Sequence, residues 1–192
     1  MLLHATGLAG AFTVEIEKRI DHRGFFARTF CAAEFGGQGL ATGMVQMNIS
    51  CSIEKGTLRG MHYQEAPYSE VKLVRCTRGA VYDVIIDMRG ESETAYRWFG
   101  VELTAENYRM LYVPEGFAHG FLSLSDDTEV TYLVSQFFTP EAERGVRWND
   151  PFFGIEWPHD ATVISEKDKA WPDFRRPEGS IGNIHLRGDK QI

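Results

Sequence analysis

Short runs of β-branched, aromatic and aliphatic residues recur along most of this chain, and glycine, aspartate, asparagine or proline separates each run from the next. Such runs are typical of β-strands, and the residues between them are typical of tight turns. The pattern predicts strands over residues 12–16, 25–30, 44–50, 70–76, 80–88, 98–103, 109–113, 120–124 and 129–138. So many short strands in one chain favour an all-β jelly roll.

Helical pattern is limited to residues 32–39, a turn at 104–107 after an N-capping threonine, and a charged stretch near 165–170. The chain has 192 residues, 43% of them hydrophobic, and shows no internal repeat, low-complexity tract or long linker. We therefore expect a single domain over 1–192, with its core at about 12–173. The tail from Pro172 onward is rich in Pro, Gly, Arg and Asp, and we expect it to be loosely attached.

The overall charge and the cysteines exclude several classes of protein. A formal net charge of -7 argues against binding a nucleic acid backbone, although a local basic pocket stays compatible with it. No run reaches membrane-spanning length, and the first ten residues lack the basic start of a signal peptide, so we expect a soluble, cytoplasmic protein that binds no membrane. Cys31, Cys51 and Cys76 are odd in number and widely spaced, and we expect buried free thiols.

Three polar residues interrupt apolar faces of the expected strands. Because side chains alternate between the two faces of a strand, Lys72, Asp83 and Tyr132 each share a face with the apolar residues two positions away. An unpaired buried polar group costs about 1 to 3 kcal/mol, so each needs a partner. They either satisfy one another as structural pairs or line a pocket for a phosphorylated ligand, together with Arg23, Arg59, His62 and His119.

Two segments, at 56–64 and 114–119, each resemble half of the metal site of a cupin barrel. A metal cupin has a His-x-His pair followed by a glutamate in its first half, whereas here the second histidine position holds Gln64. A metal site would depend on His62, His119 and a carboxylate such as Glu70, without the expected fourth ligand. A salt bridge to Lys72 is the alternative role for Glu70. We expect no metal.

The same groups suit proton transfer. A histidine in a partly desolvated pocket, held in one tautomer by a carboxylate, is a suitable general base near neutral pH. A nearby lysine can stabilise the oxyanion that forms when a carbon beside a carbonyl loses its proton. A tyrosine across the cavity can return a proton to the opposite face. A base on one side and an acid on the other is the geometry of epimerisation.

Motifs along residues 12–173 carry a resemblance to one family. They are Asp21-x-Arg23-Gly24-x-Phe26, Gln46-x-Asn48-x-Ser50, Lys55-Gly56-Thr57-Leu58-Arg59-Gly60-x-His62-Tyr63-Gln64, Lys72-Leu73-Val74, Asp83-Val84, Pro114-x-Gly116-Phe117-Ala118-His119-Gly120-Phe121, Tyr132, Pro140-x-x-Glu143-x-Gly145-x-x-Trp148-Asn149-Asp150-Pro151 and Ser165-Glu166-Lys167-Asp168. In order and spacing they resemble the dTDP-4-dehydrorhamnose 3,5-epimerases and their relatives in deoxysugar pathways.

The resemblance implies a cupin homodimer that needs no metal or organic cofactor. It implies that His62 is the base, Asp168 its partner, Tyr132 the acid on the far face and Lys72 the stabiliser of the C4 oxyanion. The substrate would be a nucleotide-diphosphate sugar, with dTDP-4-dehydro-6-deoxy-D-glucose converted to dTDP-4-dehydro-L-rhamnose. Its contacts would come from Arg23, often across the dimer, and from Gln46, Asn48, Arg59, His119, Phe138, Glu143 and Lys167. Arg28 and the inward-facing Asp83 are further candidates for substrate contacts.

Two departures from the family pattern leave alternatives open. Arg28 stands where many 3,5-epimerases have a glutamate, which reverses a charge near the nucleotide. Phe137 and Phe138 stand where relatives often have tyrosines, and phenylalanine keeps the stacking surface but lacks the hydroxyl. The alternatives are an epimerase of C3 or C5 alone on another nucleotide 4-ketosugar, a metal cupin such as a dioxygenase, and a non-catalytic sugar-nucleotide binder.

Overall fold

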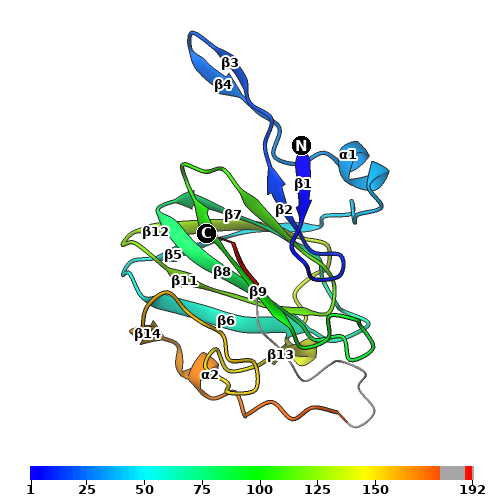
Figure 1. Ribbon diagram of the computed structural model, residues 1–192, viewed down its shortest axis with the longest axis vertical. Helices are drawn as coiled ribbons and strands as arrows, with labels where there is room; N and C mark the ends of the chain where they lie inside the picture. Colours follow the sequence, from blue (N-terminus) through cyan, green and yellow to red (C-terminus); the bar gives the residue numbers. More distant parts are fainter. Residues whose placement is uncertain (178–188, 192) are drawn as a thin grey trace.

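Two β-sheets face each other in the computed structural model, which describes residues 1–177 and 189–191 (Figure 1). The first sheet has the order β1 (Leu2–Ala5), β2 (Phe12–Glu15), β10 (Met110–Val113), β7 (Lys72–Arg78), β12 (Thr128–Val134) and β5 (Gln46–Ser52). The second has the order β13 (Glu143–Gly145), β6 (Thr57–Gln64), β11 (Phe117–Ser123), β8 (Ala80–Asp87), β9 (Trp98–Thr104) and β15 (Asp189–Gln191), and β14 (Val163–Ile164) pairs with β6. The prediction of an all-β jelly roll is confirmed.

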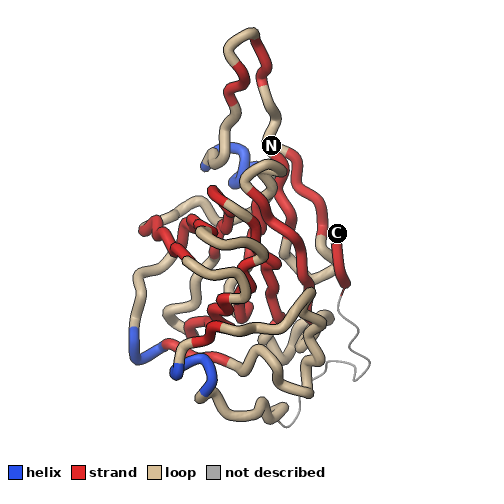
Figure 2. Tube along the Cα trace, turned by 90° about the vertical axis from the view of Figure 1, so that its left-hand side faces the viewer, coloured by secondary structure: helices blue, strands red, loops and turns tan. Residues whose placement is uncertain are grey.

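Few other elements accompany the two sheets. A hairpin of β3 (Arg19–Asp21) and β4 (Gly24–Phe26) projects away from the body of the molecule (Figures 1 and 2). The helices are α1 (Ala32–Gly37), α2 (Glu166–Lys169) and the 3₁₀ turn η1 (Pro140–Ala142). Both α-helices lie inside the expected helical stretches. None of the helices in the described part of the chain is long and apolar enough to cross a membrane.

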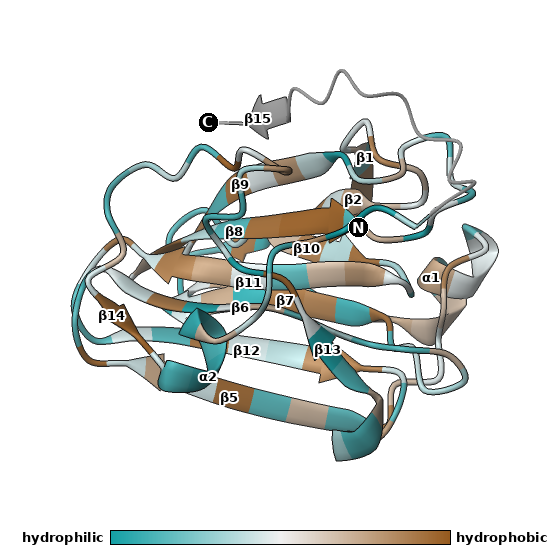
Figure 3. Cartoon of the chain, turned by 90° about the horizontal axis from the view of Figure 1, so that it is seen from below, coloured by the Kyte–Doolittle hydropathy of each residue, from teal (hydrophilic) through white to brown (hydrophobic). Residues whose placement is uncertain are grey.

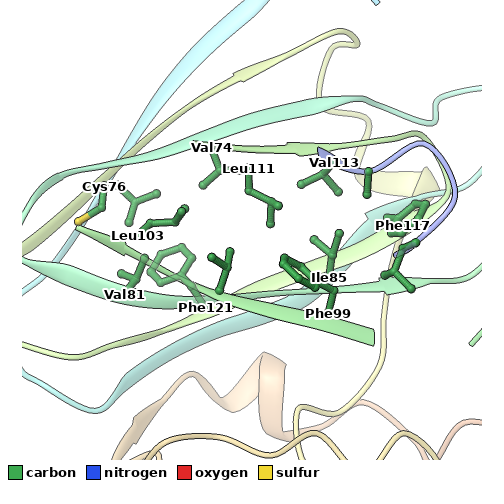
Figure 4. Close-up of a cluster of buried hydrophobic side chains, with 14 residues drawn as sticks. Val74, Cys76, Val81, Ile85, Phe99, Leu103, Leu111, Val113, Phe117 and Phe121 are labelled. Carbon is green, nitrogen blue, oxygen red and sulfur yellow. The ribbon is translucent and has the colours of Figure 1, made fainter. Parts of the chain in front are cut away.

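Apolar side chains from both sheets fill the space between them (Figure 4). Val74 of β7, Val81 and Ile85 of β8 and Val130 of β12 all belong to this cluster. Strand alternation therefore turns Lys72, Asp83 and Tyr132 toward the same interior, as the sequence predicts. Lys72 is 9% exposed, Asp83 is fully buried, and Tyr132 packs against the apolar cluster.

The chain after β13 covers the outer face of the second sheet. Tyr82, Val84 and Ile86 point to that face and pack with residues of the covering chain, so β8 is buried on both sides and mainly apolar (Figure 3). Phe174 joins this cluster and donates its N–H to the Asp150 carboxylate at 2.6 Å. At Phe174 the tail is attached more firmly than its composition indicates. Residues 178–188 and 192 lie outside the described residues.

Several expected strands differ from those observed. The strand β6 was not predicted, because its glycines and charged residues hide the alternating pattern. The expected strand over 25–30 ends at Phe26, whose partner Arg19 is the first residue of the neighbouring strand. The one over 129–138 ends at Val134, which pairs with Gln46, the first residue of β5. Both strands stop where their hydrogen-bonding partner stops.

The cysteines also differ from the prediction. Cys76 is buried and Cys31 is half-buried, but Cys51 is exposed. Cys51 lies on β5, which forms one edge of the first sheet, and its side chain is on the outward face of that strand. The expectation that all three thiols are buried is therefore wrong for Cys51.

Candidate active site

Two adjoining cavities open between the sheets and share His62, Lys72 and Tyr132 as a common wall. The first has a volume of about 530 Å³ and the second about 400 Å³. The first is also lined by Ser50, Thr57, Leu58, Arg59, His119, Phe121, Val163, Ile164, Ser165, Lys167 and Asp168. The second is also lined by Gln46, Asn48, Tyr63, Gln64, Glu70, Val134, Gln136, Phe138 and Glu143.

His62 and Asp168 form a close pair at this wall. The ring atom Nε2 of His62 lies 2.6 Å from Oδ1 of Asp168. The carboxylate is 5% exposed and the imidazole 32% exposed. Because an ionised carboxylate can only accept hydrogen bonds, Nε2 of the neutral ring carries the proton and Nδ1 keeps its lone pair. His62 therefore offers Nδ1 as a base.

The charge on Asp168 is stabilised by its surroundings. Burial on its own raises the pKa of a carboxyl group, but contacts with His62, the N–H of Gly60 and Ser165 outweigh burial, so the pKa of Asp168 lies below its ordinary value. The Gly60 N–H is 3.3 Å from Oδ2 of Asp168. The carboxylate thus stays ionised at neutral pH and can stabilise an imidazolium at His62.

Residues 162–171 carry Asp168 across the edge of β6 (Figures 1 and 3). At the start of this 162–171 segment, the N–H groups of Thr162 and Val163 donate to the carbonyl of Gly56. Ser165 then caps α2 by accepting the Asp168 N–H at 3.1 Å. At the end of the segment the indole of Trp171 lies so close over Gly145 that a Cβ atom there would collide with it. The segment is therefore attached on both sides of the carboxylate.

A bulge between β6 and β11 turns two side chains of β6 into the cavity. His119 is paired with His62, but Phe121 is paired with Arg59, so the register shifts by one residue between these pairs. Arg59 and His62 are three positions apart and would face opposite sides of a regular strand, yet both line the cavity. Gly60 lies in the bulge at φ +127°, and a Cβ there would come 2.5 Å from the Cα of Gly120.

Lys72 approaches the same cavity from the opposite sheet. Its Nζ lies 3.0 Å from Oε1 of Glu70 and 3.4 Å from the backbone oxygen of His62. Both side chains of the ion pair are buried, at 11% exposure for Lys72 and 8% for Glu70. The alternative role for Glu70, a salt bridge to Lys72, is confirmed. An ammonium group is thus held against the backbone of His62, and both side chains line the same cavities.

Tyr132 also comes from the first sheet, across the space from His62. Burial raises the pKa of its phenol, the nearby Arg59 lowers it, and the negative charge of Glu70 raises it further, with a net upward shift. The phenol is therefore protonated at neutral pH and available as a proton donor. His62 lies on one sheet and Tyr132 on the other, so the residues predicted as base and acid come from opposite sheets, and their roles stay predictions.

His119 and Asp83 form a second buried pair on the second sheet. The Nε2 atom of His119 lies 2.9 Å and 3.1 Å from the two oxygens of Asp83. His119 lines the cavity, whereas Asp83 is fully buried behind it and lines neither cavity. The expectation of a direct substrate contact at Asp83 therefore gives way to a supporting role, in which it orients His119.

Gln64 joins two loops to β6. Its side-chain amide donates to the carbonyls of Tyr68 and Phe137 and accepts the N–H of Thr139 at 2.6 Å. Each candidate metal ligand is paired with another side chain: His62 with Asp168, His119 with Asp83, and Glu70 with Lys72. Within residues 1–177 and 189–191 no group of three or more His, Cys, Asp or Glu side chains is arranged to hold a metal ion.

The remaining predicted residues divide into two groups. Gln46, Asn48, Phe138, Glu143 and Lys167 line the cavities, and the last two form an ion pair of 2.6 Å. The Gln46 side chain also accepts the N–H of Phe138 at 3.0 Å, which fixes the exposed ring near the opening.

Arg23 and Arg28 lie outside both cavities of their own chain. Arg23 is 78% exposed on the projecting hairpin, where it pairs with Asp21. Arg28 is 55% exposed and pairs with Glu34 beside α1. Contact of either arginine with substrate therefore stays a prediction.

Sequence reasoning missed the residues that hold the site together. Gly60 and Gly120 create the bulge, and Trp171 with Gly145 fixes the end of the 162–171 segment. A glycine inside a strand pattern is a known signal of a bulge or of close backbone approach, so the bulge had a readable signal. The packing of Trp171 had none, because it joins positions far apart in the chain.

The arrangement has the parts needed to move a proton on and off carbon. A base with a free Nδ1, an ammonium group beside it and a protonated phenol on the opposite sheet surround one cavity. Such a set can remove a proton from a carbon beside a carbonyl, stabilise the enolate and return a proton to the other face.

Comparison with known proteins gives one consistent result. The family model described as dTDP-4-dehydrorhamnose 3,5-epimerase matches residues 5–176. A dTDP-4-dehydrorhamnose 3,5-epimerase of Methanothermobacter thermautotrophicus is 46% identical over 174 residues, which cover 88% of this chain and 92% of that protein.

Two solved structures illustrate the similarity. The crystal structure of dTDP-4-dehydrorhamnose 3,5-epimerase from Bacillus anthracis with TDP and PPi bound has a TM-score of 0.87 and 38% identity, covering 90% of this chain and 99% of that one. A 3'-monoepimerase from Streptomyces bikiniensis in complex with dTDP-quinovose has a TM-score of 0.81 and 36% identity, covering 88% of this chain and 86% of that one.

Proposed function

The chain belongs to the dTDP-4-dehydrorhamnose 3,5-epimerase family, and from this membership and the geometry of the cavity we propose that it inverts C3 and C5 of dTDP-4-dehydro-6-deoxy-D-glucose. It is an isomerase with a cupin-type jelly roll. The observation that carries the proposal is the meeting of the His62–Asp168 pair from one side with Lys72 and Tyr132 from the facing sheet, around one cavity.

In this proposal the roles follow from the chemistry of each group. Nδ1 of His62 takes the proton from C5 or C3, and Asp168 stabilises the imidazolium that results. The electron pair of the broken C–H bond forms an enolate, whose oxygen at C4 is stabilised by the ammonium group of Lys72. Tyr132 then gives its proton to the same carbon from the opposite face. One bond to hydrogen breaks and one forms, so the carbon is inverted without a net change in composition.

After each inversion the two catalytic groups must exchange a proton with solvent. His62 holds an extra proton and Tyr132 lacks one, and the cavities open to solvent on both sides of their common wall. Solvent hydrogen is therefore incorporated at each inverted carbon. The reaction needs no metal or organic cofactor, because Lys72 supplies the positive charge that the enolate requires.

The substrate would lie with its sugar at the common wall and its nucleotide toward Phe138. Phe138 is 61% exposed and offers a flat apolar surface on which a base can stack. Gln46, Asn48 and Glu143 line the same cavity and offer polar contacts, while Arg59 and His119 lie in the other cavity. Such a charged ligand does not cross a membrane unaided, which favours a cytoplasmic location.

A homodimer is part of the same proposal. Met47 and Ile49 on the outward face of the edge strand β5 are 68% and 65% exposed, and Ile20 and Phe26 of the projecting hairpin are 78% and 65% exposed. A second copy that covers these surfaces would bury them and would let Arg23 reach the cavity of the other protomer. Met47→Lys should yield monomers in sedimentation experiments, and an unchanged dimer would argue against this interface.

Solvent exchange tests the function directly. The protein is incubated in D₂O with dTDP-4-dehydro-6-deoxy-D-glucose, and NMR follows deuterium at C3 and C5. Deuterium at both carbons is expected for wild type, and none for His62→Ala. Exchange that persists unchanged in His62→Ala would remove His62 from the mechanism.

A single epimerisation is the second candidate. The Streptomyces bikiniensis 3'-monoepimerase is 36% identical to this chain, close to the 38% of the Bacillus anthracis 3,5-epimerase, so identity alone does not separate the two activities. Phe138, which lacks the hydroxyl that relatives often have, is the residue on which this alternative depends. Label at one carbon only in the same NMR experiment would establish it.

A further inference from the structure

Glu70 has no assigned part in the proposed reaction, although it lies within the cavity wall. Its Oε1 atom is 3.0 Å from Nζ of Lys72, and its side chain is 8% exposed. The only other hydrogen-bond acceptor found near this Nζ among the described residues is the His62 carbonyl, at the longer distance of 3.4 Å. Glu70 is therefore the main anchor of the lysine.

The second oxygen of Glu70 is not accounted for by the ion pair with Lys72. Oε2 is buried and has no hydrogen-bond partner among the described residues. A buried ion pair with an unsatisfied oxygen is a poor device for stability, because apolar residues of similar volume often serve as well or better. A buried polar group without a hydrogen-bond partner calls for an explanation, and a catalytic role is one such explanation. Glu70 is thus better explained by what it does to its neighbours than by the stability of the fold.

Those neighbours are two of the groups that act on the substrate. Glu70 lines the second cavity together with Lys72 and Tyr132. The Glu70 carboxylate contacts Lys72 directly, and its negative charge contributes to the raised pKa of Tyr132. A single carboxylate is therefore coupled both to the group that stabilises the enolate and to the group that reprotonates it.

We propose that Glu70 is a positioning residue, which holds the ammonium group of Lys72 at the site of the enolate oxygen and, from the wall of the same cavity, opposes the ionisation of Tyr132. The inference rests on the proposed function and extends it. Because this role is exerted through Lys72 and Tyr132 and not by binding the substrate, loss of Glu70 should lower kcat and leave KM nearly unchanged.

Glu70→Gln tests the proposal, because it keeps the shape of the side chain and one oxygen for Lys72 but removes the charge. Replacing a charged acceptor by a neutral one should lower kcat about tenfold. Removal of a negative charge also favours the phenolate, so the alkaline limb of the kcat profile should move to lower pH. Glu65→Gln is the matched control, since Glu65 is 50% exposed and pairs with Arg144 at the surface.

A spectroscopic measurement makes the test independent of turnover. The ultraviolet titration of tyrosinate is compared between each protein and the same protein with Tyr132→Phe, which isolates the phenol of Tyr132. Its titration should move to lower pH in Glu70→Gln and stay in place in Glu70→Asp, which keeps the charge. If Glu70→Gln fails to fold, Glu70→Asp still tests the positioning of Lys72, because its shorter side chain should lower kcat, and an unchanged kcat would overturn that role.

The outcomes separate the two levels of the argument. Titrations that coincide in wild type and Glu70→Gln would overturn the inference, as would an increase in KM at constant kcat, which would mark a substrate contact. Wild-type protein that incorporates no deuterium into the substrate would instead overturn the proposed function, and the inference with it.

Discussion

Replacement of Asp168 by asparagine tests how the carboxylate supports His62. Two N–H donors meet this side chain: the Nε2–H of His62 at 2.6 Å and the N–H of Gly60 at 3.3 Å, one at each oxygen. Asparagine has a single oxygen, so one donor must face an NH₂ group. If the NH₂ faces His62, the ring takes the other tautomer, and Nδ1 carries a proton and is no longer a base.

The size of the effect follows from these two hydrogen bonds. A hydrogen bond to a charged group contributes about 1.5–3 kcal/mol and one between neutral groups about 0.5–1.5 kcal/mol, and an unsatisfied buried donor costs about 1–3 kcal/mol. With these contributions combined, Asp168→Asn should raise the activation free energy by about 2–4 kcal/mol, which corresponds to a loss of about 30-fold to 1,000-fold in kcat. KM should change little, because Asp168 acts on the ring and not on the bound sugar.

Deuterium incorporation at C3 and C5 provides the assay, with initial rates measured at saturating substrate. The control is Asp160→Asn, which changes an exposed carboxylate just before the 162–171 segment. A rate for Asp168→Asn within about threefold of wild type would correspond to a change below about 0.7 kcal/mol in activation free energy. The His62–Asp168 pair would then contribute little to catalysis, which would refute the reasoning.

The stability of the same variant has a defined dependence on pH. In the folded protein the pKa of Asp168 is lowered, chiefly by its hydrogen bond to His62 acting against burial, so its charge stabilises the fold above a pH of about 4. That contribution is lost as the pH falls through the lowered pKa. Wild type and Asp168→Asn should therefore converge in free energy of unfolding in acid.

Three further predictions concern the surroundings of the site. Gly60→Ala should destabilise the fold by about 2–4 kcal/mol in chemical denaturation, because the φ of +127° at Gly60 and its contact with the opposing backbone exclude a Cβ. Gly37→Ala in α1 is the control and should be neutral or slightly stabilising, because Gly37 has open space around it. Gln64→Leu should raise KM more than it lowers kcat, because Thr139 and the Phe138 loop lose their anchor; an unchanged KM would contradict this. Burial, above all, raises the pKa of Tyr132, so kcat should stay constant up to about pH 10 and fall above it. A fall in kcat that begins well below pH 10 would exclude this phenol as the acid.

Much of the site was predictable because it obeys local rules. Strand alternation is a property of the backbone, so the inward direction of Lys72, Asp83 and Tyr132 could be read from their apolar neighbours. The Glu70–Lys72 pair follows from the same rule. The roles of His62 and Asp168 came from the family resemblance, because the two residues are 106 positions apart and only the fold brings them together.

The features that the sequence did not predict depend on tertiary contacts that no local pattern encodes. The bulge at Gly60 changes which residues of β6 face inward, so alternation fails there and with it the recognition of the strand. Asp83 was expected to contact substrate because it lies on an inward face, but His119 fills the space in front of it. The exposure of Arg23 and Arg28 depends on the hairpin projecting from the body, which follows from tertiary contacts.

The attachment of the 162–171 segment affects the order in which parts of the active site are lost during unfolding. The barrel strands hold His62, Lys72 and Tyr132, but Asp168 arrives on a late segment that adds only the two residues of β14 to the sheet. Elements with few backbone hydrogen bonds open more readily than the sheets beneath them. Partial unfolding at this edge would separate the carboxylate from the imidazole while the barrel stays intact. During synthesis the same dependence would delay activity until residue 171 has left the ribosome and docked on Gly145.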